Sequence, residues 1–70
     1  MRKFSPVRIK RRRKRLRLTQ LQLAEKAGLS RTYVIQLEQG RKVPCANTIT
    51  KIADALDVKV SYFFVNSVYQ

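Results

Sequence analysis

The chain has 70 residues, enough for one small domain, and leaves little room for a catalytic cleft. At 44% apolar residues it is too hydrophobic to be disordered, and sixteen Lys and Arg against four Asp and Glu give a net charge of +12. That charge favours polyanions, nucleic acid first among them. Because Cys45 is the only cysteine and histidine is absent, an intrachain disulfide is excluded and the residues argue against a zinc site.

No stretch approaches the roughly 20 uninterrupted apolar residues of a membrane-spanning helix, and the N-terminus lacks the apolar core of a secretory signal. We therefore expect a cytoplasmic protein with no membrane partner, associated with the nucleoid when it binds DNA. The sequence offers no glycine-rich phosphate loop and no nucleophile–base pair. We expect no catalytic residues, no cofactor and no bound metal.

The N-terminal residues 1–5 read as a basic arm carrying Arg2 and Lys3. We expect this arm to be loose, as chain termini usually are, although such arms enter the minor groove in some DNA-binding domains. Ser5 and Pro6 have the residue types of a helix N-cap and first helical position. A helix is predicted from Pro6 to Leu16, with Ile9, Leu16 and the stem of Arg13 facing inward.

Residues 10–15 are all basic, so this first helix places like charges next to one another at i and i+4. Each such pair costs a few tenths of a kcal/mol at low salt, a cost that a bound anion would offset. The basic tract is therefore a candidate phosphate-binding surface. A solvated basic face and a nuclear-localisation tract are the alternative interpretations, although the tract lies within an apolar helical frame.

Two capped helices separated by a glycine follow, between Thr19 and Gly40. Thr19 and Gln22 have the spacing of a capping box, and Gly28 can adopt the left-handed conformation that ends a helix. Ser30 then caps a second helix, predicted from Arg31 to Gln39. Two short helices joined by a three-residue turn form the corner of a helix-turn-helix.

Helical periodicity assigns the faces of these two helices. Leu23, Ala24 and Ala27 of the first helix and Val34, Leu37 and Glu38 of the second are predicted to point inward. The outward face of the second helix then carries Arg31, Thr32, Tyr33 and Gln36. An inward-facing carboxylate at Glu38 needs a cationic partner, since an unpaired buried charge is costly.

A further amphipathic helix is predicted from Ala46 to Leu56, with Ile49, Ile52, Ala53 and Leu56 forming one apolar stripe. Asp54 and Asp57 at its end are placed unfavourably against the helix dipole. From Val58 onward β-branched and aromatic residues dominate, and by propensity they would form a strand.

The chain as a whole resembles the DNA-binding domains of the Cro and phage-repressor type, also called lambda-repressor-like. The residues that carry the resemblance are Arg13, Leu18-Thr19-Gln20, Leu23-Ala24, Gly28-Leu29-Ser30, Leu37-Glu38, Gly40, Arg41-Lys42, Pro44, Ile49, Ile52-Ala53, Leu56 and Val58. The match covers roughly Val7 to Phe64.

The resemblance implies an all-α fold, a compact five-helix domain over residues 6–65, followed by a tail at 66–70. It replaces the strand suggested by propensity with a short fifth helix from about Val60 to Val65, with Val60 and Phe63 inward. It also implies that Arg13 pairs with Glu38, joining the first helix to the end of the recognition helix, since arginine can satisfy a carboxylate with two parallel hydrogen bonds.

By the same resemblance we expect a sequence-specific regulator of transcription, a repressor, that reads the major groove of double-stranded DNA. The residues expected to contact bases are Arg31, Thr32, Tyr33 and Gln36. Those expected to contact phosphates are Gln20, Ser30, Arg41, Lys42, Asn47 and Arg11. In relatives with glutamine at the position of Arg31, that glutamine braces the residue equivalent to Gln20, and this chain departs from the pattern.

The C-terminal segment carries more apolar surface than a small monomer usually exposes. We expect a homodimer contact there, from Tyr62, Phe64 and Val65 with Val68 and Tyr69 beyond them, and a pseudo-palindromic operator. Packing of these aromatics in the core is the alternative. The alternative function is a protein- or RNA-interaction module on the same fold, such as an antitoxin or a ribosome-associated factor.

Overall fold

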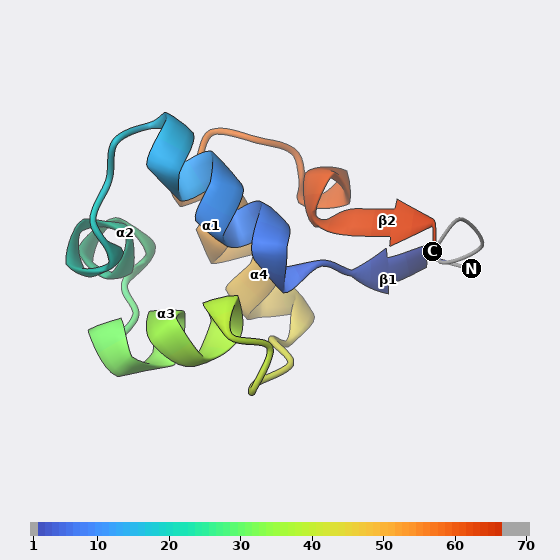
Figure 1. Cartoon of the computed structure of the whole chain (residues 1–70), viewed down its shortest axis with the longest axis horizontal. Helices are drawn as coiled ribbons and strands as arrows, with labels where there is room; N and C mark the ends of the chain where they lie inside the picture. The colour runs from blue at the N-terminus through green and yellow to red at the C-terminus, as the bar shows by residue number, and fades with distance from the viewer. Residues whose placement is uncertain (1, 67–70) are drawn as a thin grey trace.

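The elements follow the predicted order through four helices and depart from it at both ends of the chain. The computed structural model describes residues 2–66. In chain order the elements are β1 Arg2–Phe4, α1 Pro6–Arg15, α2 Gln20–Ala27, α3 Arg31–Glu38, α4 Ala46–Ala55, the 3-10 turn η1 Val60–Phe63 and β2 Phe64–Asn66. Figure 1 shows the helices gathered into one body, from which β1 and β2 project side by side. The predicted all-α fold with a helix-turn-helix is confirmed.

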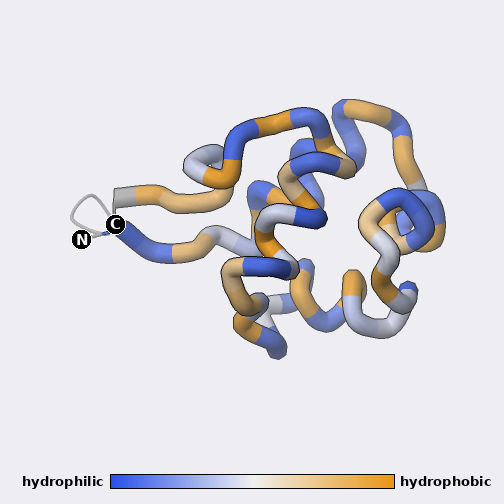
Figure 2. Tube along the Cα trace, turned by 180° about the vertical axis from the view of Figure 1, so that it is seen from behind, coloured by the Kyte–Doolittle hydropathy of each residue, from blue (hydrophilic) through white to orange (hydrophobic). Residues whose placement is uncertain are grey.

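One hydrophobic core joins all four helices and η1. Its buried members are Ile9, Leu23, Ala24, Ala27, Val34, Leu37, Ile49, Ile52, Ala53, Ala55, Leu56 and Phe63. Figure 2 shows hydrophobic and hydrophilic stretches alternating along the helices, as expected for amphipathic helices that bury one face. Within residues 2–66, no helix combines the length and the apolarity needed to cross a membrane.

The α2–α3 corner forms as the local signals predicted. The hydroxyl of Thr19 accepts from the Gln22 backbone N–H at 3.0 Å, and the Gln22 side chain accepts from the Thr19 backbone N–H at 2.8 Å. Gly28 ends α2 at φ 69, the left-handed conformation that an L residue adopts at a steric cost. Ala24 is 1% exposed, so its small side chain lets α3 pack closely against α2.

The predicted fifth helix is wrong in length and kind. Val60–Phe63 forms one 3-10 turn, and the chain then continues as strand β2 from Phe64 to Asn66. Because the element is a single turn, Phe63 is its one buried residue, at 0% exposure, while Val60 is 39% exposed instead of inward. Phe64 and Val65 follow their own β propensity because a partner strand is available.

That partner is the N-terminal arm, which the sequence analysis expected to be loose. Arg2–Phe4 forms β1 and pairs antiparallel with β2, in the register Arg2↔Asn66, Lys3↔Val65 and Phe4↔Phe64. The ring of Phe4 lies against the rings of Phe63 and Phe64, with centroids 6.3 and 5.8 Å apart. The fold therefore extends beyond the expected 6–65 boundaries, and residues 67–70 of the expected tail lie outside the described residues.

Two details of α1 also differ from expectation. Ser5 occupies the N-cap position, but its side chain makes no capping bond, and its N–H instead donates to the Phe63 carbonyl at 2.6 Å. At the other end, α1 stops at Arg15 and the chain turns through Arg17 at φ 59. Leu16 is consequently outside the helix and 37% exposed instead of inward.

Candidate nucleic-acid interface

The amino-terminal end of α3 presents polar side chains outward on a fixed backbone. The Ser30 hydroxyl accepts from the Tyr33 backbone N–H at 3.1 Å, which caps the helix. Arg31 and Thr32 in the first turn are exposed, and Gln36 one turn later is half-buried. Tyr33 is also half-buried and packs against the core, so only part of its ring is free for an outward contact.

The opposite side of α3 is locked to the core. Val34 is 1% and Leu37 0% exposed, as periodicity predicted. Glu38 is inward as well, and its carboxylate receives the Arg13 guanidinium through two bonds, Nε to Oε2 at 2.6 Å and Nη2 to Oε1 at 3.1 Å. Arg13 also donates from Nη1 to the Leu18 carbonyl at 2.9 Å. The predicted Arg13–Glu38 ion pair is present, and it fixes α3 relative to α1 and the start of α2.

A third donor to the Glu38 carboxylate was missed by the sequence analysis. The Gln20 side chain, from the first residue of α2, donates from Nε2 to Glu38 Oε1 at 3.2 Å. The family pattern predicts no such donor, because Arg31 stands where relatives have the glutamine that braces the residue equivalent to Gln20. The inward orientation of Glu38 was a usable signal, since a carboxylate can accept more bonds than one arginine supplies.

The basic residues from Arg8 to Arg17, which include the tract at residues 10–15, divide into two groups with different roles. Arg8 donates to the Tyr62 carbonyl at 3.0 Å, Arg12 to the Leu56 carbonyl at 3.0 Å, and Arg13 to Glu38. These side chains hold the fold together. The remaining basic residues of this region are exposed and make no side-chain hydrogen bond within residues 2–66: Lys10, Arg11, Lys14, Arg15 and Arg17. The side chains of this second group are available to bind an anion.

The loop between α3 and α4 adds further exposed polar groups. Gly40 ends α3 at φ 76, where its N–H donates to the Leu37 carbonyl and the Arg41 N–H donates to that of Gln36. Arg41 and Lys42 follow and are exposed, and Pro44 returns the chain to the interior. Asn47, the second residue of α4, is exposed next to the first-turn N–H groups of that helix.

A comparison with protein families identifies this arrangement. The model of the helix-turn-helix family HTH_3 matches residues 9–63, from α1 through η1. The chain belongs to the helix-turn-helix family.

Two repressors and a controller protein resemble the chain in sequence or in structure. The immunity repressor protein of Bacillus phage phi105 is 50% identical over 54 residues, which cover 77% of this chain and 38% of the phage protein. The restriction-modification controller protein C.AhdI from Aeromonas hydrophila superposes with a TM-score of 0.82 at 34% identity, over 84% of this chain and 89% of that one. The P22 c2 repressor, in complex with synthetic operator 9T, superposes with a TM-score of 0.81 at 26% identity, over 87% and 92%.

The chain spans only part of the length of the curated relatives that it matches. The matched region covers between 33% and 59% of each of them. The similarity therefore concerns only part of each relative, and the activity of the whole relatives is attributed to this chain only as a proposal.

The expected dimer residues of this helix-turn-helix domain lie at the base of the β1–β2 ribbon. Tyr62, Phe64 and Val65 are each half-buried. Tyr62 packs edge-on against Phe63 at 5.5 Å between centroids, and the Arg8 guanidinium lies 5.4 Å from its ring centroid. The alternative expectation was that these aromatics pack in the core. Tyr62 and Phe64 do pack against the core with part of their surface, and the rest of that surface is exposed. Val68 and Tyr69 lie outside the described residues.

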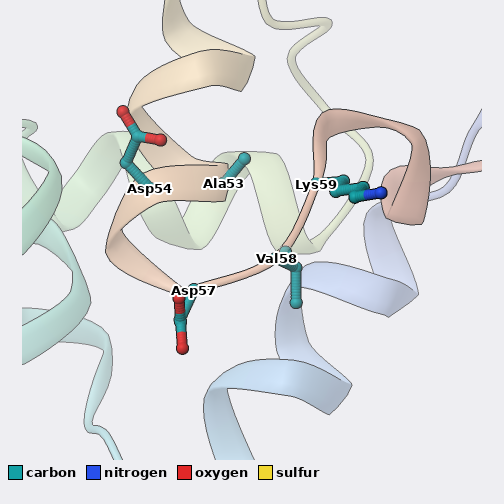
Figure 3. Close-up of a pocket in the computed structure, with 5 residues that line it drawn as sticks. All are labelled: Ala53, Asp54, Asp57, Val58 and Lys59. Carbon is teal, nitrogen blue, oxygen red and sulfur yellow. The ribbon is translucent and has the colours of Figure 1, made fainter.

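An open hollow of about 430 Å³ lies beside the end of α4, lined by Ala53, Asp54, Asp57, Val58 and Lys59. Figure 3 shows the carboxylates of Asp54 and Asp57 pointing in different directions, so they do not converge on a common ligand. In the part of the chain described, residues 2–66, no group of three or more His, Cys, Asp or Glu side chains is placed to hold a metal ion. None of the expected DNA-contacting residues lines this hollow.

Proposed function

We propose that this chain binds double-stranded DNA sequence-specifically and regulates transcription as a repressor. The observation that carries the proposal is the orientation of α3, whose first turn exposes Arg31 and Thr32 while Val34, Leu37 and Glu38 hold its other side. A helix fixed in this way can enter the major groove with its N-terminal residues at the base edges. The similarity to a phage immunity repressor and to a repressor solved with its operator supports the same function.

The base-reading roles follow from the chemistry of the outward side chains. Arg31 has the paired donors that match the O6 and N7 acceptors of guanine, and the amide of Gln36 matches N6 and N7 of adenine. The methyl group of Thr32 suits contact with a thymine methyl. Tyr33, with only part of its ring free, contacts a base or a phosphate at the edge of this surface.

The phosphate-binding roles fall to groups on both sides of α3. At the start of α2, Gln20 lies at a helix N-terminus, where free N–H groups and the helix dipole favour an anion. The Ser30 hydroxyl accepts a backbone bond and keeps its own proton to donate. Beyond α3, the exposed residues Arg41, Lys42 and Asn47 contact the next stretch of backbone, and Arg11 adds a contact from α1.

We further propose that the chain acts as a homodimer through the exposed parts of Tyr62, Phe64 and Val65. A two-fold dimer binds half-sites about one helical turn apart, so the operator is pseudo-palindromic. Such a regulator acts in the cytoplasm, at the nucleoid, and catalyses no reaction.

Selection of bound oligonucleotides from a random pool, followed by footprinting at physiological salt, tests the function directly. We expect one enriched, pseudo-palindromic motif and a discrete protected site. Uniform affinity for all duplexes at every ionic strength would contradict sequence-specific recognition, since purely electrostatic binding carries no sequence information. Preferential binding to RNA or to a protein would favour the alternative module.

A further inference from the structure

The buried carboxylate of Glu38 holds two side chains from two different helices. Its side chain is 3% exposed, at the last residue of α3. Arg13 of α1 contacts both of its oxygens, and Gln20 of α2 donates from Nε2 to Oε1 at 3.2 Å. This is the only hydrogen bond of the Gln20 side-chain amide within residues 2–66, and it links this side chain to the recognition helix.

The chemistry of this contact fixes the orientation of the Gln20 amide. An ionised carboxylate only accepts hydrogen bonds, so the amide must turn its NH₂ group toward Glu38. An NH₂ group has two donors, and Glu38 Oε1 uses one of them. The second N–H stays free at the amino-terminal end of α2. The backbone N–H groups of Gln20 and Leu21 also lack acceptors within the helix there, whereas that of Gln22 is capped by Thr19.

Charge neutralisation makes the same site compatible with an anion. A bare carboxylate next to the start of α2 would repel a phosphate. The paired hydrogen bonds from Arg13 compensate the charge of Glu38, and Arg13 is itself 9% exposed in its side chain, so the pair is removed from solvent together. Glu38 can therefore orient Gln20 without excluding an anion from it.

We propose that Glu38 is a positioning residue for DNA binding, which holds Gln20 so that its second amide N–H and the backbone N–H groups of Gln20 and Leu21 bind one phosphate group. The inference rests on the proposed DNA-binding function and adds to it. It assigns to Glu38 the brace that a glutamine at the position of Arg31 provides in relatives, and it leaves Arg31 free to contact a base.

A double-mutant cycle tests this coupling. Because phosphate contacts do not depend on sequence, the probe is a labelled duplex of about 20 base pairs of arbitrary sequence, measured by fluorescence anisotropy at fixed salt. Gln20→Ala weakens binding by about tenfold in the wild-type background, the loss of one hydrogen bond to a charged group. In the Glu38→Gln background the same change weakens binding by less than about threefold, since a neutral amide at position 38 both donates and accepts and no longer forces the NH₂ group of Gln20 toward it.

Glu25→Gln is the matched control, because Glu25 is an exposed residue of the same helix as Gln20 and the change removes the same charge. Gln20→Ala keeps its full effect in that background, and urea unfolding of each variant reports stability separately. An equal effect of Gln20→Ala in the wild-type and Glu38→Gln backgrounds would overturn the proposal while leaving DNA binding intact. Failure of the wild-type protein to bind any duplex would instead overturn the proposed function.

A second measurement needs no substitution and applies even where Glu38→Gln does not fold. In the NMR spectrum of the unmodified protein, the two side-chain amide protons of Gln20 resonate well apart, with the proton bonded to Glu38 downfield. On addition of the duplex the other proton shifts and the downfield one stays. Coincident resonances in the free protein contradict the brace, whether or not the protein binds DNA.

Discussion

The Nε atom of Arg12 donates a hydrogen bond to the backbone carbonyl oxygen of Leu56 at 3.0 Å, which joins α1 to the carboxyl-terminal end of α4. The last turn of α4 has no basic residue of its own, and Asp54 lies in it. Since this end of a helix carries partial negative charge, a cation there is stabilising. Arg12 supplies that cation from another helix.

Replacing Arg12 with methionine should therefore destabilise the fold, because it keeps an unbranched apolar stem but removes the guanidinium. We expect the free energy of unfolding to fall by about 1–2 kcal/mol, from the lost hydrogen bond and the lost interaction with the helix end. Urea unfolding followed by circular dichroism measures the change. Arg11→Met is the matched control, because Arg11 is exposed and should stay within about 0.5 kcal/mol of wild type. Equal effects of the two substitutions would show that the free energy of unfolding depends on the net charge alone and not on the Arg12–Leu56 hydrogen bond.

The helix-turn-helix could be predicted from the sequence because its signals are local. The capping box of Thr19 and Gln22 spans four residues, and Gly28 ends the helix that they begin. The inward positions follow from a 3.6-residue period that needs no knowledge of the partner helix. For the same reason Glu38 could be assigned to the interior before any contact was known.

What could not be predicted depends on residues far apart in the chain. Whether Arg2–Phe4 is loose or a strand depends on the segment at residues 64–66, and neither three-residue segment carries enough pattern to specify the pairing alone. The division of the basic tract has the same origin. Arg11 and Arg12 are chemically identical neighbours, and only the position of Leu56 makes one structural and leaves the other exposed.

The Arg13–Glu38 pair should contribute strongly to stability. In Glu38→Ala the guanidinium of Arg13, 9% exposed, loses its carboxylate and stays largely buried. Removing one partner of a buried ion pair costs about 3–5 kcal/mol, so we expect a loss of that size in urea unfolding. A loss below about 0.5 kcal/mol would be that of a surface pair and would contradict the burial of this one.

The pairing of β1 with β2 should be measurable through Phe4. Its ring is half-buried against Phe63 and Phe64, so Phe4→Ala should lower the free energy of unfolding by about 1–3 kcal/mol, less than for a fully buried ring. Lys3→Ala serves as the control, since Lys3 is exposed on the same strand. If thermal unfolding shows no difference between Phe4→Ala and wild type, the N-terminal segment is the loose arm that the sequence alone suggested.

The exposed thiol of Cys45 should titrate below the usual range. Its Sγ lies 3.3 Å from the Thr48 hydroxyl, and this side-chain hydrogen bond, aided by the Thr48 backbone N–H, lowers the pKa of Cys45. Since the thiolate is the reactive form, a lower pKa gives faster alkylation at any pH below it. Thr48→Val removes the hydroxyl, raises the pKa and should shift the midpoint of the pH–rate profile for iodoacetamide upward.

Thr50→Val is the control for that measurement. The Thr50 hydroxyl donates to the Ala46 carbonyl at 3.1 Å and has no bond to the thiol, so the pH–rate profile should keep its wild-type midpoint. A profile that is unchanged in Thr48→Val would assign the lowered pKa to the helix backbone and not to the hydroxyl.

Arg31 and Lys42 should separate base recognition from phosphate binding, because both are exposed but only Arg31 lies in the first turn of α3. Arg31→Ala should cost about 1–3 kcal/mol on the selected operator and little on a random duplex. Lys42→Ala should weaken both duplexes alike and reduce the slope of log affinity against log salt by about one. Anisotropy titrations on the two duplexes at several salt concentrations measure both quantities. Identical behaviour of the two variants would mean that Arg31 contacts the DNA backbone, because a phosphate contact carries no direct sequence information.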